Sequence, residues 1–414
     1  MWLQEATVRN VTRAMKEVQA FDLGGDYRPA ARAALKRILE SRVEEELTLH
    51  TGRRRYERRK GDEPPLYRNG TVERTIYTEL GPVVLRLGRL RKAIESRVIF
   101  RYQRRPAHVN RLISACFLLG MSTRKAARTL TMLLGGGLSH QTVSEIAKVL
   151  DREVEKYHRR ELEDKYRFLY FDAVHLKKKG AAKVVKKTVL TATGVTHDGR
   201  HERIDFLVSS GESEASWEGF INNIYNRGLS GEGVELIVVD GNGALSNALE
   251  RVYPRIPRQL CWAHKTHNVS NYLSKSRWAV VKPYVQAISH AQSRKEAIGA
   301  FWEFSGRFKE KHPEAVKTVA SNLDHLLEFY RVRPKREALK GKGTEEQKQV
   351  RLELWRQVRT TNLIERSFKE VRRRTRPMGV FENNQSMERI IFSVFYYLDT
   401  EDGKNNLFLF TQEA

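Results

Sequence analysis

Two short apolar runs, each followed by an aspartate, constrain the fold of this chain most strongly. Residues 169–171 (Leu-Tyr-Phe) precede Asp172, and residues 236–239 (Leu-Ile-Val-Val) precede Asp240. Such runs favour central strands of a sheet, and the patterns around them predict further elements. We expect strands at 166–176, 184–194 and 203–209, a helix at 214–227, a strand at 234–240, a helix at 244–251 and a short strand at 258–262. This order predicts a mixed α/β sheet.

The two aspartates lie at or near the carboxyl ends of predicted strands, where open α/β sheets bind their ligands. A third carboxylate, Glu365, opens a predicted helix over 362–374 that is otherwise densely cationic. Mg2+ prefers hard oxygen ligands, and two such ions about 3.5–4 Å apart need shared carboxylates. One ion can activate a water or a 3'-hydroxyl, while the other stabilises the leaving oxygen. Asp172, Asp240 and Glu365 therefore predict a Mg2+ site.

Each of these carboxylates also has a purely structural interpretation. Asp172 and Asp240 could simply cap strands or begin turns, and Asp240-Gly241 is a good turn dipeptide. If Asn362 is the N-cap of its helix, Glu365 falls at N3, where it completes a capping box and complements the helix dipole. Glu370, five residues on, is a rival carboxylate on a different face. The structural and metal-binding roles of Glu365 are compatible with each other.

The charge of the chain indicates a polyanionic partner. Its 414 residues include 75 Lys and Arg against 50 Asp and Glu, a formal net charge of +25, and a protein this cationic repels itself unless a polyanion is bound. A basic run follows Glu365 along its helix, and these side chains suit phosphate contacts. The alternative is that they simply form a solvent-exposed face of the helix. The residues of this run are Arg372, Arg373, Arg374 and Arg376.

Membrane contact and a disulfide framework are not expected. The sequence has no apolar run of about 18 residues and no signal-peptide pattern at its start. Cys116 and Cys261 are the only two cysteines, which fits a reducing cytosol.

The region before the predicted sheet contains a helix-turn-helix pattern. A helix at 106–119 is followed by a helix that Ser122 can cap, by the glycines 135–137, and by a second helix, 141–160, that Ser139 can cap. This pattern is typical of DNA-binding proteins, although an ordinary α-hairpin in a core has it too. The candidate DNA contacts here are Arg124, His140 and Gln141.

The outer parts of the chain are predicted to be mostly helical. We expect a helix at 28–47, a basic loop at 51–65, a β-hairpin with strands at 71–79 and 83–90, helices throughout 268–330, a loop at 331–344 and a helix at 345–358.

The sequence Cys261-Trp-Ala-His264, with His267 nearby, resembles part of a zinc site. Structural zinc normally needs four ligands, and Cys116 is the only other thiol. We therefore do not expect a zinc site. We expect instead that Cys261 is buried and that His264 orients the site. His175, three residues after Asp172, either contacts substrate or faces solvent.

Taken in order, these motifs resemble those of one known family, the Mutator-type bacterial insertion-sequence transposases. That family belongs to the DDE class and has an RNase H-like catalytic core. The matching segments are Arg68-Asn69-Gly70, Gly120-Met121-Ser122-Thr123-Arg124, Phe171-Asp172-Ala173, Gly211-Glu212-Ser213-Glu214, Asp240-Gly241, Gln259-Leu260-Cys261-Trp262-Ala263-His264-Lys265 with Asn268, Thr360-Thr361-Asn362 with Ile364-Glu365, and Arg372-Arg373-Arg374-Thr375-Arg376 with Gly379.

The resemblance implies a fold and a role for each site residue. Asp172, Asp240 and Glu365 would be the metal-binding triad, with separations of 240 − 172 = 68 and 365 − 240 = 125 residues. The longer gap would hold an all-helical insertion. Cys261 and His264 match the family's C-x-x-H motif, which would support the site without binding zinc.

The implied fold class is an α/β RNase H-like catalytic core with an all-α insertion, preceded by a mostly α DNA-binding region with a β-hairpin. The implied domains are a helical and hairpin region at 1–105, a helix-turn-helix region at 106–163, the first part of the core at 164–268, the insertion at 269–357, and the glutamate helix with the end of the core at 358–414.

The implied activity is transposition. The protein would bind element ends, cleave DNA and join the 3'-hydroxyl end to target DNA by Mg2+-dependent phosphoryl transfer, with Mn2+ as a substitute and no covalent protein intermediate. It would act in the cytoplasm, at the nucleoid, as a homodimer or higher homo-oligomer on DNA. Two alternatives remain: an RNase H-like nuclease or resolvase without strand transfer, and a non-catalytic DNA-binding regulator.

Overall fold

The computed structural model divides the chain into two compact units, the first ending at Val149 and the second beginning at Leu150. The structure describes residues 12, 13, 16 and 26–401, except 59, 63, 101, 102, 120, 137 and 182. The division between the units falls inside the region 106–163 that the sequence grouped together. The first unit contains α2 (Arg28–Thr51), β1 (Arg68–Thr78), β2 (Gly81–Leu90), α3 (Ala107–Leu118), α4 (Thr123–Leu134) and α5 (His140–Ala147).

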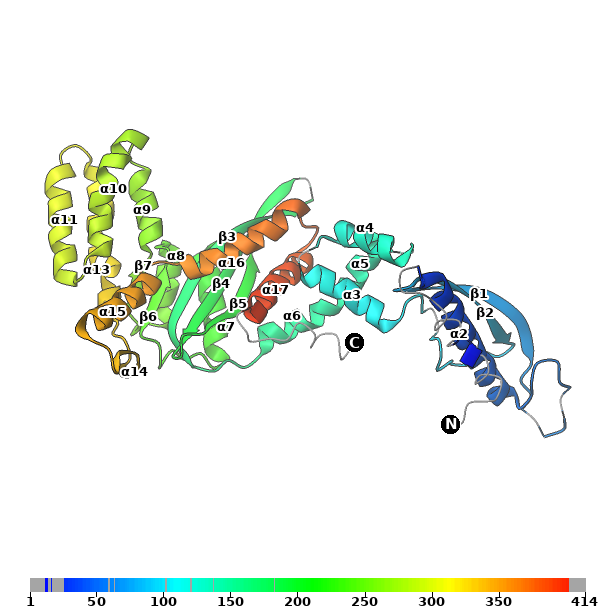
Figure 1. The fold of residues 1–414 in the computed structure, drawn as a ribbon. Helices are drawn as coiled ribbons and strands as arrows, with labels where there is room; N and C mark the ends of the chain where they lie inside the picture. The colour runs from blue at the N-terminus through cyan, green and yellow to red at the C-terminus, as the bar shows by residue number, and fades with distance from the viewer. Residues whose placement is uncertain are drawn as a thin grey trace. The chain divides into compact units, whose positions relative to one another are not determined.

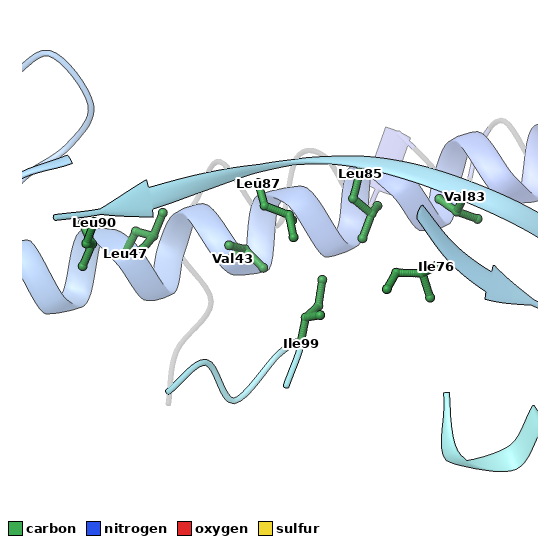
Figure 2. Close-up of a cluster of buried hydrophobic side chains, with 8 residues drawn as sticks. All are labelled: Val43, Leu47, Ile76, Val83, Leu85, Leu87, Leu90 and Ile99. Carbon is green, nitrogen blue, oxygen red and sulfur yellow. The ribbon is translucent and has the colours of Figure 1, made fainter. Parts of the chain in front are cut away.

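The predicted β-hairpin is confirmed and forms a small core with the long helix α2. Strands β1 and β2 pair antiparallel from Arg68↔Leu90 to Thr78↔Gly81, and α2 packs against β2. Buried and exposed residues alternate along β2 with the period of two that a half-buried strand requires. Figure 2 shows the resulting cluster, which consists of Val43, Leu47, Ile76, Val83, Leu85, Leu87, Leu90 and Ile99.

The predicted caps of the helix-turn-helix pattern are present. Ser122 Oγ accepts a hydrogen bond from the Lys125 amide at 3.2 Å, and Ser139 Oγ accepts one from the Thr142 amide at 3.1 Å. Gly135 ends α4 with a φ of 69°, a left-handed conformation that favours glycine. These caps satisfy amides that would otherwise lack partners at the two helix starts.

The predicted single helix 141–160 is wrong, because the chain breaks at Lys148 into α5 and α6 (Val149–Arg159). The Lys148 amide bonds to the carbonyls of Glu145 and Ile146 instead of continuing the regular helical pattern. Helix α6 consequently belongs almost wholly to the second unit.

The second unit is built on a five-stranded mixed sheet in the order β5-β4-β3-β6-β7 (Figure 1). Strands β3, β4 and β5 pair antiparallel, whereas β3, β6 and β7 pair parallel. The connections to β6 and β7 run through helices, as parallel neighbours require. The strands are β3 (Tyr166–Lys179), β4 (Val184–Thr196), β5 (His201–Ser209), β6 (Leu236–Val239) and β7 (Arg258–Leu260).

Helices cover this sheet and form the predicted helical segment after it. Helix α16 packs on β3, α17 packs on β5, and α7 packs on α8. Residues 331–344, predicted to be a loop, contain the short helix α14. No helix in the described part of the chain has both the length and the apolar character needed to cross a bilayer. The helices of this unit after α6 are α7 (Glu214–Asn226), α8 (Gly243–Val252), α9 (Trp262–Ser270), α10 (Lys275–His290), α11 (Arg294–Phe308), α12 (Pro313–Ala320), α13 (Leu323–Leu326), the 3-10 helix η1 (Glu328–Arg331), α14 (Arg336–Leu339), α15 (Thr344–Val358), α16 (Asn362–Thr375), the 3-10 helix η2 (Arg376–Met378) and α17 (Asn384–Glu401).

Gln259 ties the helical segment to the sheet. Its side chain is fully buried in β7, where Nε2 donates to the Leu326 carbonyl at 3.0 Å and Oε1 accepts from the Phe329 amide at 2.8 Å. A buried amide group that loses such partners costs about 1–3 kcal/mol, so the contact holds the end of α13 and the start of η1 against β7.

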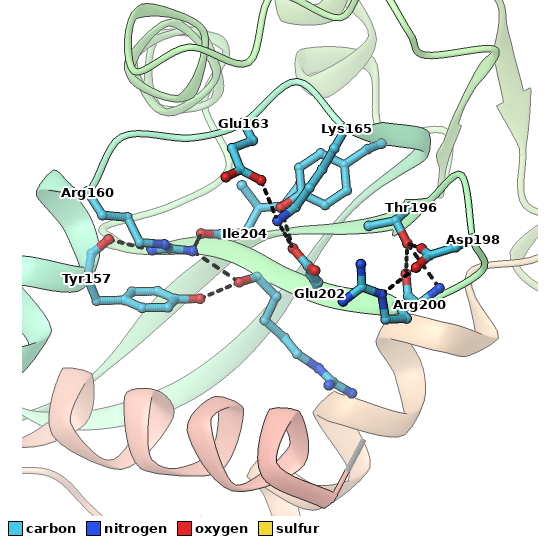
Figure 3. A network of polar contacts seen from close by, with 11 residues as sticks. Tyr157, Arg160, Glu163, Lys165, Thr196, Asp198, Arg200, Glu202 and Ile204 are labelled. Atoms are coloured by element: carbon cyan, nitrogen blue, oxygen red, sulfur yellow. Dashed lines mark hydrogen bonds and ion pairs between the residues drawn. The ribbon is translucent and has the colours of Figure 1, made fainter. Parts of the chain in front are cut away.

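Helix α6 is fastened to strand β5 by polar contacts at its end (Figure 3). Tyr157 Oη donates to the Arg203 carbonyl at 2.6 Å, and the Arg160 guanidinium donates to the carbonyls of Tyr157, Arg203 and Ile204. These bonds use carbonyls at the end of α6 and on the outer strand of the sheet.

Candidate active site

The register of the sheet places Asp172 and Asp240 next to each other. The last parallel pair between β3 and β6 is Phe171↔Val239, so each aspartate is the residue that immediately follows it. The sequence predicted that Asp172 lies at or near the end of its strand, but β3 continues to Lys179 as part of a ribbon with β4, so Asp172 lies in mid-strand. It is the parallel pairing that ends there.

Local hydrogen bonds orient both aspartates. Asp172 is 5% exposed, and its Oδ1 accepts from the Ala173 amide at 2.7 Å. Asp240 Oδ1 accepts from the Asn242 amide at 2.9 Å across a turn in which Gly241 has a φ of 94°. A side chain at Gly241 would strain this backbone. The turn that orients Asp240 therefore requires glycine at this position.

Asn242 and Glu212 are site residues to which the sequence gave no role. The Asn242 side chain caps α8 through the amides of Ala244 and Leu245, and its Nδ2 donates to Glu212 Oε2 at 2.7 Å. An asparagine that directly follows Asp-Gly and directly precedes a helix is an N-cap signal that could have identified Asn242. Glu212 also lies 3.3 Å from His175 Nε2.

Glu365 lies in the first turn of α16, half-buried, with its amide bonded to the Thr361 carbonyl at 3.0 Å. The predicted capping box is wrong, because Thr361 rather than Asn362 is the N-cap and its side chain caps no amide of the helix. The Thr361 hydroxyl instead contacts Cys261 Sγ at 3.3 Å. Glu365 therefore has no capping role that competes with ligand binding.

Cys261 and His264 connect the Asp240 strand to the start of the glutamate helix. The Cys261 amide donates to the Val239 carbonyl at 2.8 Å, and its fully buried Sγ accepts from the Thr361 amide at 3.2 Å. His264 Nδ1 lies 3.4 Å from Thr361 Oγ1, and its Nε2 lies 4.0 Å from Glu365 Oε1. The C-x-x-H segment thus touches the elements that present two of the three carboxylates.

The electrostatics of the site favour a bound cation. Burial, and then the charge of Asp240, raise the pKa of Asp172 to about 7, with a smaller contribution from Glu365. Contact with the Cys261 sulfur raises the pKa of His264 to about 9, and Asp172 and Asp240 add to this rise while burial opposes it. The carboxylates therefore repel one another, and His264 offsets part of their charge.

The donor set fits a hard divalent cation such as Mg2+, because the three site carboxylates supply oxygen ligands. Among the residues that the structure describes, however, no three His, Cys, Asp or Glu side chains are spaced so that they could share one metal ion. The chemistry of the donors and the raised pKa of Asp172 thus support a cation site, whereas the spacing in this conformation is wider than a common ligand shell.

The basic residues after Glu365 have different environments. Arg372, Arg373 and Arg376 are exposed. Arg374 is buried, pairs with Glu370 at 2.9 Å and lies 4.5 Å from the Tyr397 ring, so in this conformation it does not face a ligand. Contacts with Arg373 and Arg374 lower the pKa of Glu370 to about 2, which leaves this rival carboxylate committed to ion pairs on its own helix.

In the first unit, the three candidate DNA contacts are exposed. Arg124 lies in the first turn of α4, and His140 and Gln141 are the first two residues of α5. The start of the second helix of such a pair is the part that reaches base edges in helix-turn-helix proteins.

We expect Asp172→Asn to raise the thermal unfolding midpoint in the presence of a chelator. A carboxyl whose pKa is higher in the folded state loses stability as the pH rises from its ordinary value of 3.8 to about 7, and the loss is constant above that. The gain should thus grow between pH 4 and 7 and reach at most about 4 kcal/mol, or several degrees. Differential scanning calorimetry from pH 4 to 8 measures it.

Asp198→Asn is the matched control. The Thr196 hydroxyl and Arg200 lower the pKa of Asp198 to about 2 (Figure 3), so its neutralisation should give no gain at any pH. A midpoint for Asp172→Asn that is unchanged or lower at pH 8 would mean that Asp172 carries no excess charge cost.

Comparison with known proteins matches nearly the whole chain to one protein family. The family model "Transposase, Mutator family" matches residues 6–402. The chain is 26% identical over 365 residues to the transposase for insertion sequence element IS905 of Lactococcus lactis, covering 88% of each chain. It is 27% identical to that for ISRM5 of Rhizobium meliloti, covering 92% of this chain and 90% of the relative. It is 28% identical to that for IS256 in transposon Tn4001 of Staphylococcus aureus, covering 89% of each.

Proposed function

The chain belongs to the Mutator family of transposases, and we propose that it is a DDE-class enzyme that cleaves DNA at element ends and joins the 3'-hydroxyl end to target DNA. The observation that carries this proposal is the end of the β3–β6 pairing, which puts Asp172 and Asp240 next to each other. Glu365 joins them electrostatically from a helix that Cys261 holds in place. The strand order β5-β4-β3-β6-β7 supports an RNase H-like core.

Each carboxylate has a defined part in this proposal. Asp172, Asp240 and Glu365 would hold Mg2+, for which Mn2+ substitutes. When bound, the metal activates the attacking hydroxyl and offsets charge on the leaving oxygen. Asp172 gives up its proton more readily once a cation is near, and the His264 cation balances the remaining negative charge.

Cationic side chains would hold the DNA. Arg372, Arg373 and Arg376 are exposed at and just beyond the end of the glutamate helix, where they can bind phosphates near the reacting bond. In the first unit, Arg124, His140 and Gln141 would contact the element end from a helix-turn-helix. A homodimer or higher homo-oligomer would bring two ends together, acting at the nucleoid in the cytoplasm.

A joining assay tests the proposal against both alternatives. The purified chain is incubated with Mg2+, a supercoiled plasmid and a labelled duplex that carries the DNA flanking the reading frame and ends in a free 3'-hydroxyl. We expect label to appear covalently in the plasmid. Cleavage without joining would support a nuclease or resolvase, and binding with neither activity would support a regulator.

A further inference from the structure

A ribbon of two β-strands extends beyond the sheet next to the candidate active site. It consists of residues 176–179 of β3 and 184–187 of β4, which pair with each other from Leu176↔Lys187 to Lys179↔Val184. Strand β5 pairs with β4 only from Thr188 onward, and β6 pairs with β3 only up to Phe171. Figure 1 shows the β3–β4 hairpin projecting past the neighbouring strands, beside the end of α16.

The connection between α16 and α17 holds the ribbon in place. The Lys179 amide donates to the Phe381 carbonyl at 2.7 Å, and the Phe381 amide donates to the Lys177 carbonyl at 3.0 Å. The side chains of Phe381 and Leu176 are both buried. The ribbon is therefore a supported part of the second unit, with a defined direction relative to β3 and α16.

The charge of the ribbon is entirely positive. Residues 177–187 include no acidic residue and six lysines, namely Lys177, Lys178, Lys179, Lys183, Lys186 and Lys187. Lys177 lies directly opposite Lys186 in the register, an arrangement in which like charges destabilise a strand pair. Within the described residues, no ion pair joins either of them to a carboxylate. A bound polyanion would remove this repulsion.

The positive surface continues to the candidate active site. His175 lies two residues before Lys177 and therefore on the same face of β3. Burial and then the charge of Lys186 lower the pKa of His175, Glu212 opposes this change, and Arg372 adds to it. The ribbon continues the strand that carries Asp172, and it and Arg372 of α16 thus place positive charge beside His175.

We propose that this ribbon binds the phosphate backbone of the duplex DNA whose reacting bond lies at Asp172, Asp240 and Glu365. The inference rests on the proposed function for the position of that bond. Lys177 is five residues and Lys179 seven residues beyond Asp172, about 17 and 23 Å along a strand. At about 3.4 Å per base pair, the lysines reach phosphates about five to seven base pairs from the reacting bond. Lysine suits this task as a point charge that reads no sequence.

The test uses the full chain with Lys177, Lys179, Lys183 and Lys186 all changed to Gln. Each neutralised phosphate contributes about 0.9 to the slope of log affinity against log salt. For the end duplex we expect the magnitude of this slope to decrease by up to about 3.6. Phosphate-ethylation interference about five to seven base pairs from the reacting bond should also disappear. Replacement of the same four lysines by Arg should keep both signals. The smaller variant Lys177→Gln/Lys186→Gln should lower the slope by up to about 1.8, and it serves if the larger one does not fold.

The matched control removes four exposed lysines from the helical segment: Lys275, Lys282, Lys309 and Lys311 are changed to Gln. Its slope and interference pattern should match those of the wild type. An unchanged slope in the ribbon variants, or an equal loss in this control, would overturn the inference. If the wild-type chain neither cleaves nor joins DNA, the proposed function fails instead, and the ribbon result then bears only on DNA binding.

Discussion

Asp172→Asn, Asp240→Asn and Glu365→Gln should each lower Mg2+-dependent cleavage of end DNA by more than about 100-fold. The loss should exceed the roughly 10–100-fold cost of removing a partner outside the ligand shell, because each change removes a ligand charge from the proposed cation site. DNA binding should persist, since the phosphate contacts come from other side chains. Cleavage of a labelled end duplex, together with a binding titration, measures both effects.

Glu370→Gln is the matched control for this series. It makes the same chemical change five residues along the same helix, where the carboxylate pairs with Arg373 and Arg374. It should cleave DNA at close to the wild-type rate. If two of the three site variants also keep near-wild-type cleavage, the assignment of the triad is wrong.

Cys261→Ala should lower cleavage by roughly 10–100-fold while the protein stays folded. The change removes the sulfur that accepts from the Thr361 amide and hydroxyl, so the start of α16 loses its link to the Asp240 strand. The unpaired Thr361 amide should also lower stability by about 1–3 kcal/mol. Cleavage rates and the thermal unfolding midpoint separate the two effects.

Cys116→Ala is the corresponding control, because Cys116 lies in α3 of the first unit. Cleavage by this variant should be unchanged. Elemental analysis of the wild type should find no stoichiometric zinc. One zinc ion per chain, with unfolding when it is removed, would instead make Cys261 a structural metal ligand.

The sequence predicted the elements well where a single local pattern determines them. The apolar runs before Asp172 and Asp240 became β3 and β6, and the serines at 122 and 139 became caps. It failed where the backbone interrupts a continuous pattern. The helix expected over 141–160 has continuous apolar periodicity, yet the backbone tightens at Lys148 and starts a new helix.

The sequence indicated the three candidate carboxylates but not the contacts around them. Aspartates that directly follow apolar runs could be recognised from their neighbours alone. The contact between Cys261 and Thr361 joins residues that are 361 − 261 = 100 positions apart, and no local pattern indicates it. The capping-box prediction for Glu365 failed for the same reason, because the Thr361 side chain makes a tertiary contact instead of capping the helix.

The lysine ribbon, too, was only partly predictable from the sequence. Its charge is visible in the sequence, but its projection depends on where β4 stops pairing with β5. The burial of Arg374 is another case, since Arg372 and Arg373 just before it are exposed, whereas Arg374 lies against Tyr397 of α17.

Divalent-cation binding to the full chain tests the central claim most directly. Mn2+ titration followed by electron paramagnetic resonance, with uncleaved end DNA present, counts bound ions without relying on catalysis. The wild type and Glu370→Gln should bind about two ions per chain, and each of Asp172→Asn, Asp240→Asn and Glu365→Gln should bind fewer or bind them much more weakly. Equal numbers and affinities in all five proteins would contradict a shared cation site at these three carboxylates.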